Sequence, residues 1–86
     1  MISPITPLAG LCDDDPAPIV FETIELAVGY MEPWDVVDGL WRIWDSTGRR
    51  YEPSCPTPDR WPIELLASEE FDAPDLVREA LGLPAA

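Results

Sequence analysis

The side chains of this sequence that are able to do chemistry are almost all carboxylic acids. The 86 residues include 17 aspartates and glutamates against five arginines, and they include neither histidine nor lysine. The chain therefore lacks the commonest general base, the commonest metal ligand and the amine that forms Schiff bases. Catalysis by a pair of carboxylates remains possible, but no two acidic residues lie in a sequence context that predicts a shared buried site. We expect no enzymatic activity and no cofactor.

A run of three aspartates, Asp13-Asp14-Asp15, suggests a divalent cation, because such ions prefer carboxylate oxygens. Three successive side chains do not readily converge on one ion, and the glycine and distal glutamate of an EF-hand loop are absent. Cys12 and Cys55 form no zinc pattern. They would form one disulfide in an oxidising compartment, but without an export signal free thiols are the commoner case. We expect no metal site and a solvated aspartate run.

The charge is unevenly distributed along the chain. The net charge is −12, and residues 1–41 hold eight acidic residues and no basic one. The negative electrostatic field of such a charge repels phosphate, which argues against direct binding of nucleic acid or of an anionic membrane. It attracts a basic protein surface instead. The alternative is that the charge only keeps a small protein soluble. Neither a signal peptide nor a membrane span is visible, so we expect a cytoplasmic protein.

The first half of the chain carries few clear signals of secondary structure. Four prolines in residues 1–18 argue against a continuous ladder of backbone hydrogen bonds, so we expect an acidic, flexible or extended arm there, followed by one domain at 19–86. Residues 19–31 fit either a strand or a helix, and their β-branched and aromatic content favours a strand. Residues 34–38 fit a second short strand or a loop.

The clearest element is a β-hairpin at 40–52, with strands at 40–45 and 49–52 and a turn in which Gly48 supplies a positive φ. Prolines 53, 56 and 58 then predict the end of the sheet. The overall expectation is an α+β fold, with a small antiparallel sheet of three to four strands and one or two C-terminal helices.

Two segments favour those C-terminal helices. Pro62 is well placed in the first turn of a short helix at 63–67. Asp72 is a good N-cap for a second helix, which Gly82 would end.

The tryptophans and the acidic residues supply the candidate binding site. Trp41 and Trp44 have opposite parity in one strand, so they point to opposite faces of the sheet and one of them is a candidate exposed anchor. The alternative is that the N-terminal arm or an arginine covers it. Carboxylates on or between the strands would form a patch that imitates nucleic-acid phosphates. The candidate partner-binding residues are Glu22, Glu32, Asp35, Asp38, Trp44 and Asp45.

These features predict a small acidic inhibitor or modulator that occludes a basic, nucleic-acid-binding surface of a partner protein. A bacterial or phage counter-defence factor that mimics nucleic acid, or an immunity-type protein, would act in this way. The alternative is a structural or assembly component that forms a homodimer or larger homo-oligomer through its tryptophan-bearing sheet. An enzyme that uses carboxylates alone is a third and weaker hypothesis.

Overall fold

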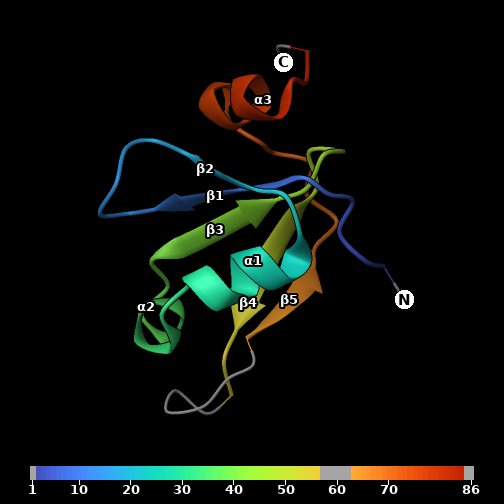
Figure 1. The fold of residues 1–86 in the computed structure, drawn as a ribbon. Coiled ribbons are helices and arrows are strands. Elements are labelled where there is room, and N and C mark those ends of the chain that lie inside the picture. The colour runs from blue at the N-terminus through green and yellow to red at the C-terminus, as the bar shows by residue number, and fades with distance from the viewer. Residues whose placement is uncertain (1, 57–62, 85–86) are drawn as a thin grey trace.

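The computed structural model, which describes residues 2–56 and 63–84, contains a five-stranded antiparallel sheet with helices on both faces (Figure 1). The strand order is β2-β1-β3-β4-β5. The α+β class is confirmed, but the sheet has more than the three to four strands expected. The elements in chain order are β1 (Leu8–Cys12), β2 (Ile19–Phe21), α1 (Ile24–Tyr30), α2 (Pro33–Val37), β3 (Trp41–Trp44), β4 (Arg50–Ser54), β5 (Glu64–Ala67) and α3 (Asp75–Leu81).

Strand β1 lies inside the sheet, between β2 and β3. The expectation that residues 1–18 form a flexible or extended arm without a continuous ladder is therefore wrong for Leu8–Cys12, which pairs antiparallel with both neighbours. The four prolines flank this strand and do not interrupt it, so every residue of the strand can donate a backbone hydrogen bond. Leu8 and Ala9 are fully buried, one on each face of the sheet.

The strand interpretation of residues 19–31 is correct only for Ile19–Phe21 and wrong for the rest, which forms α1. Thr23 caps this helix, because its side-chain oxygen accepts a hydrogen bond from the Leu26 backbone N–H at 3.1 Å. Leu26 and Tyr30 of this helix are both exposed. The buried positions of the helix follow the helical period instead.

Residues 34–38 were expected as a short strand or a loop, and most of them lie in helix α2. Pro33 occupies the first turn of α2, where its missing N–H has no intrahelical partner to lose. Only Val36 of this helix is buried, so one side chain anchors it to the rest of the molecule.

The predicted hairpin is confirmed as β3 and β4, and Gly48 in the turn has φ 86°. The sheet does not end at Pro53, because β4 continues to Ser54 and pairs with β5. The predicted helix at 63–67 is wrong, since Glu64–Ala67 is strand β5. Its leucines and alanine suit a helix, but pairing with β4 overrides that preference. Pro58 and Pro62 lie outside the described residues.

A single C-terminal helix, α3, is present in the described chain, and it ends at Gly82 as expected. Its N-cap is Pro74, so the prediction that Asp72 caps it is wrong. The other two helices, α1 and α2, lie between β2 and β3 in the sequence and not at the C-terminus.

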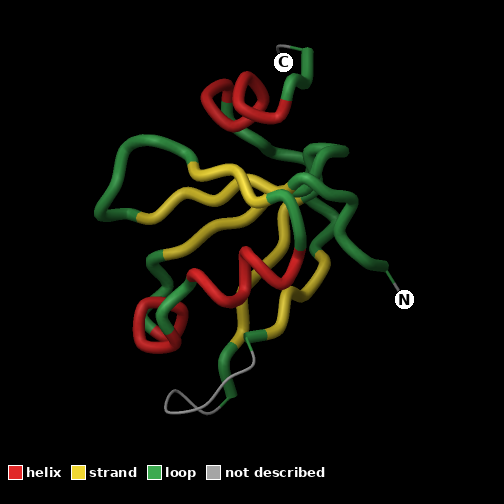
Figure 2. The backbone as a smooth tube through the Cα atoms, in the orientation of Figure 1, coloured by secondary structure: helices red, strands yellow, loops and turns green. Residues whose placement is uncertain are grey.

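The sheet separates two apolar clusters, and Figure 2 shows α3 on the opposite side of the sheet from α1 and α2. The larger cluster joins α1 and α2 to the sheet, and the smaller one joins α3 to the opposite face. Both faces of the sheet are therefore covered. The buried residues are Leu8, Phe21, Ala27, Met31, Val36, Trp41, Ile43, Tyr51 and Ile63 in the first cluster and Ala9, Trp44, Ala73 and Val77 in the second.

Candidate partner-binding surface

Asp45, a candidate for partner binding from the sequence, is buried at the start of the hairpin turn and is only 1% exposed. Its carboxylate accepts hydrogen bonds from the Thr47 N–H at 2.9 Å and the Tyr51 hydroxyl at 3.0 Å. It also accepts from the Thr47 hydroxyl and the N–H groups of Ile5 and Arg49. This saturated carboxylate holds the N-terminal segment against the hairpin. Its burial leaves Asp45 almost no exposed surface with which to contact a partner in this structure.

The environment of Asp45 shifts two pKa values. Burial by itself would raise the pKa of Asp45, but hydrogen bonds from Thr47, Ile5 and Tyr51 together hold it below its ordinary value of 3.8. Burial and the hydrogen bond to Asp45 raise the pKa of Tyr51 to about 12. Tyr51 therefore stays protonated at neutral pH and keeps donating to Asp45.

We expect Asp45 to make the protein sensitive to acid. Because its folded pKa lies below its unfolded pKa, its contribution to stability is complete above the unfolded value and is lost as the pH falls through the folded value. The free energy of unfolding should therefore drop more steeply in the wild type than in Asp45→Asn as the pH falls below about 4. Urea titrations at several pH values measure this difference. Parallel pH profiles of the two proteins would contradict the prediction.

Trp44 is also unavailable to a partner, because it is 3% exposed beneath α3. Its Nε1 donates to Oδ1 of Asp72 at 3.0 Å. Trp41 and Trp44 do occupy opposite faces of the sheet, as their parity predicts. The cover over Trp44 comes from α3 and the segment before it, and Ala9 and Leu11 of residues 1–18 belong to the same apolar cluster. Neither Trp41 nor Trp44, the two tryptophans of the sheet, is exposed as an anchor in this structure.

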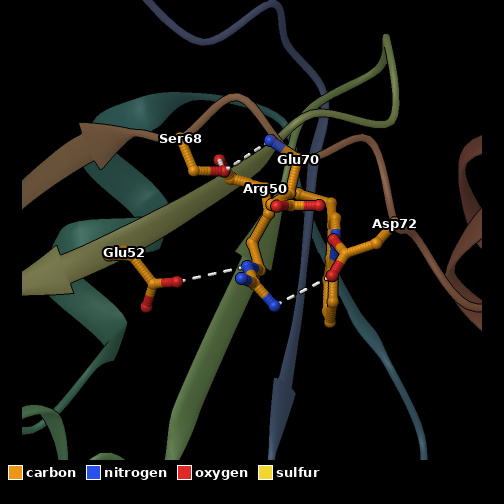
Figure 3. Close-up of polar contacts among 6 residues, drawn as sticks. Arg50, Glu52, Ser68, Glu70 and Asp72 are labelled. Atoms are coloured by element: carbon orange, nitrogen blue, oxygen red, sulfur yellow. Dashed lines mark hydrogen bonds and ion pairs between the residues drawn. The ribbon is translucent and has the colours of Figure 1, made fainter.

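Asp72 joins Trp44 to an ion-pair cluster around Arg50, drawn in Figure 3. The guanidinium of Arg50 lies between Asp72, at 2.8 Å, and Glu52, at 3.1 Å. The Arg50 backbone N–H also donates to the Glu70 carbonyl at 2.8 Å. This cluster fastens the segment before α3 to β4, which explains why Asp72 is not free to cap the helix.

The other described arginines also contact groups of this chain. These contacts use most of the positive charge of the molecule internally. Arg42 pairs with Asp13 at 3.1 Å, Arg49 lies 4.5 Å from the Phe71 ring centre and donates to the Ser68 carbonyl, and Arg78 donates to the Pro84 carbonyl.

The four remaining candidates, Glu22, Glu32, Asp35 and Asp38, lie on and around α1 and α2. Asp35 is half-buried and the other three are exposed. Within residues 2–56 and 63–84, none of the four carboxylates forms an ion pair. Glu32 and Asp35 also lie near the N-terminus of α2, where negative charge favours the helix. Their charge is thus compatible with a purely structural role as well as with binding.

The same two helices expose apolar side chains. Trp34 is one of these, and its exposure was not predicted from the sequence. Trp34 is 63% exposed. Pro33 was a usable signal, because it starts a short helix in which only one face can reach the core. We call this region the α1–α2 surface, and it comprises Glu22, Glu25, Leu26, Tyr30, Glu32, Trp34, Asp35, Val37 and Asp38.

A hollow of about 380 Å³ lies beside this surface. It brings together two of the candidate residues, Glu32 and Asp35, and adds Asp15 from the aspartate run. Glu22 and Asp38 do not line it. The lining residues are Cys12, Asp15, Ile19, Tyr30, Glu32, Asp35 and Trp41.

The described residues also bear on metal coordination and on membrane crossing. Across the described parts of the chain, no group of three histidine, cysteine, aspartate or glutamate side chains is arranged to hold a metal ion. Asp13 is engaged with Arg42, and Asp15 accepts a hydrogen bond from the Ala17 N–H. No helix within the described ranges is long and apolar enough to cross a membrane.

Comparison with known proteins identifies no relative. No protein-family model matches the chain, and no curated protein or solved structure is significantly similar to it.

Proposed function

We propose that this protein binds a basic surface of another protein through the α1–α2 surface and thereby blocks access to that surface. One observation carries the proposal. The indole of Trp34 is exposed on α2, and the same helices and the residues beside them carry carboxylates that form no ion pair within the described chain. Interfaces are typically anchored by such exposed aromatic side chains, and a surplus of one charge steers the opposite charge towards it.

The remaining apolar side chains of the surface support the same reading. Leu26 and Tyr30 are each 57% exposed, and Val37 is 50% exposed. Leu26 and Tyr30 are four residues apart in α1 and so share a face, as do Trp34 and Val37 in α2. A partner with an apolar patch inside a basic rim would cover both kinds of group. A nucleic-acid-binding groove is one such surface, which makes inhibition by occlusion the expected outcome.

Replacement of Trp34 tests this proposal. The tagged protein is incubated with a lysate of its source organism, and bound proteins are identified by mass after washing at low and high salt. We expect the wild type to retain one basic protein that high salt releases. Trp34→Ala should weaken binding of the purified partner about tenfold or more, because the indole is the central anchor.

Leu76→Ala is the matched control. Leu76 is 56% exposed on α3, remote in sequence from the α1–α2 surface, so its removal should leave the affinity for the partner unchanged. Equal affinities of the wild type and Trp34→Ala would refute the proposed binding surface. Recovery of only further copies of this chain would instead favour the homo-oligomeric assembly role.

A further inference from the structure

We infer that the hollow beside the α1–α2 surface receives an arginine side chain of the basic partner. This inference rests on the proposed function and specifies the group that the surface recognises. The hollow carries three carboxylates, from Asp15, Glu32 and Asp35. None of them is ion-paired within the part of the chain that the structure describes. Three such carboxylates at one concave site favour a cation over a neutral or anionic ligand.

The walls of the hollow favour a planar cation. Tyr30 and Trp41 both line it, with ring centres 5.9 Å apart and ring planes at 89° to each other. A guanidinium stacks on aromatic faces and pairs with carboxylates through two parallel hydrogen bonds, whereas an ammonium is a compact, strongly hydrated charge. Arginine therefore matches both the aromatic and the acidic parts of the lining.

An unpartnered donor supplies an independent reason to expect a ligand. Trp41 is 7% exposed, and its Nε1 is buried without a hydrogen-bond partner in the described chain. A buried N–H without an acceptor is costly and uncommon in folded proteins. The opposite tryptophan, Trp44, has its N–H satisfied by Asp72. The orphaned donor thus belongs to the tryptophan that lines the hollow.

The Trp41 side chain lines the hollow, and its ring is oriented with the N–H on the edge remote from Gly10. Cζ3 of the indole lies against Gly10, where an added Cβ would be only 3.0 Å away. Cζ3 stands across the six-membered ring from the carbon that bears Nε1, so the N–H points away from Gly10. Tyr30, which forms a T-shaped ring contact with Trp41, is 57% exposed, so its side chain can adjust when a ligand enters. A backbone carbonyl next to the partner's arginine would then accept from Nε1, while the guanidinium pairs with the carboxylates.

The test uses the full-length, ¹⁵N-labelled protein and the peptide acetyl-Gly-Arg-Gly-amide. Indole N–H signals are assigned with single tryptophan-to-phenylalanine variants and followed during titration. We expect the Trp41 indole signal to shift and saturate while the Trp44 signal stays in place. The double variant Glu32→Gln/Asp35→Asn should raise the Kd about tenfold, because it removes two of the three carboxylates. The same peptide with citrulline in place of arginine should not bind.

The matched control is Glu69→Gln/Glu79→Gln, which lowers the net negative charge equally at two exposed positions outside the hollow. Its Kd should stay at the wild-type value. An unmoved Trp41 signal, or an equal rise of the Kd in both double variants, would overturn the inference. A lysine peptide that binds as tightly would overturn the assignment to arginine. Dispersed spectra of each variant confirm that it is folded.

The outcomes separate this inference from the proposed function, because Trp34 does not line the hollow. If Trp34→Ala no longer binds the partner while the Trp41 indole signal does not shift with the peptide, the α1–α2 surface is supported and the arginine site is refuted. If the peptide binds in the hollow but no basic protein is captured that high salt releases, the arginine site is supported and the proposed function is refuted.

Discussion

Asp45→Ala should lower the free energy of unfolding by about 3 kcal/mol. The substitution removes an acceptor that serves the Tyr51 hydroxyl, the Ile5 N–H and both donors of Thr47. Tyr51 is fully buried, so its hydroxyl would be left without water or protein as a partner. The cost of an unsatisfied buried group adds to the loss of the hydrogen bonds themselves. Equilibrium unfolding in urea measures the change.

Asp14→Ala is the control for this experiment, because Asp14 is exposed and lies in the turn between β1 and β2. Its stability should stay within about 0.5 kcal/mol of the wild type. Loss of stability by the same amount in both variants would mean that net charge, and not the hydrogen-bonded turn, governs the effect. Unchanged stability in Asp45→Ala would refute the structural role assigned to Asp45.

Gly10→Ala should destabilise the fold by about 2 kcal/mol. Gly10 lies in β1, and a Cβ at this position would come 2.8 Å from Cδ1 of Ile43 and 3.2 Å from Cε2 of Phe21. Ile43 is fully buried and Phe21 nearly so, so neither side chain can yield without disturbing the larger apolar cluster. Overpacking of this kind forces side chains out of their preferred rotamers. Urea unfolding again measures the change.

Gly29→Ala is the matched control, and its effect should have the opposite sign. Gly29 lies in helix α1, and no atom lies within 4 Å of a Cβ added there. The same substitution should therefore stabilise the protein by about 0.5 to 1 kcal/mol, since alanine favours the helix and glycine does not. Destabilisation by both substitutions, or by neither, would contradict the packing described around Gly10.

Local signals explain the parts of the fold that could be predicted from the sequence. The hairpin of β3 and β4 was predictable because a turn with Gly48 separates two β-rich segments, and that chemistry acts between near neighbours. The end of α3 at Gly82 was predictable for the same reason. Alternation in β3 correctly separated Trp41 from Trp44. Strand β5 was not predictable, because its partner is β4 and its own residues prefer a helix.

The candidate site also has features that could be predicted from the sequence and features that could not. The acidic character of residues 1–41 was evident from composition, and Glu32 and Asp35 do meet at one hollow. The burial of Trp44 and Asp45 was not foreseen, because burial depends on what packs against a residue. Sequence alternation places Trp44 on a face of the sheet but does not reveal that α3 covers that face. The exposure of Trp34 was missed because the sequence does not reveal that no other element of the described chain packs over this side chain.

The sequence by itself determined the α+β class, the central hairpin, the C-terminal helix and the surplus of negative charge, since turn chemistry, capping and composition are properties of short segments. Only the tertiary structure decided which carboxylates are used internally and which are left unpaired. Asp45 and Asp72 are held by groups up to 40 residues away, whereas Glu32 and Asp35 meet no cation in the described chain. Such long-range partners are chosen by how the sheet and helices pack, and no short stretch of sequence encodes that choice.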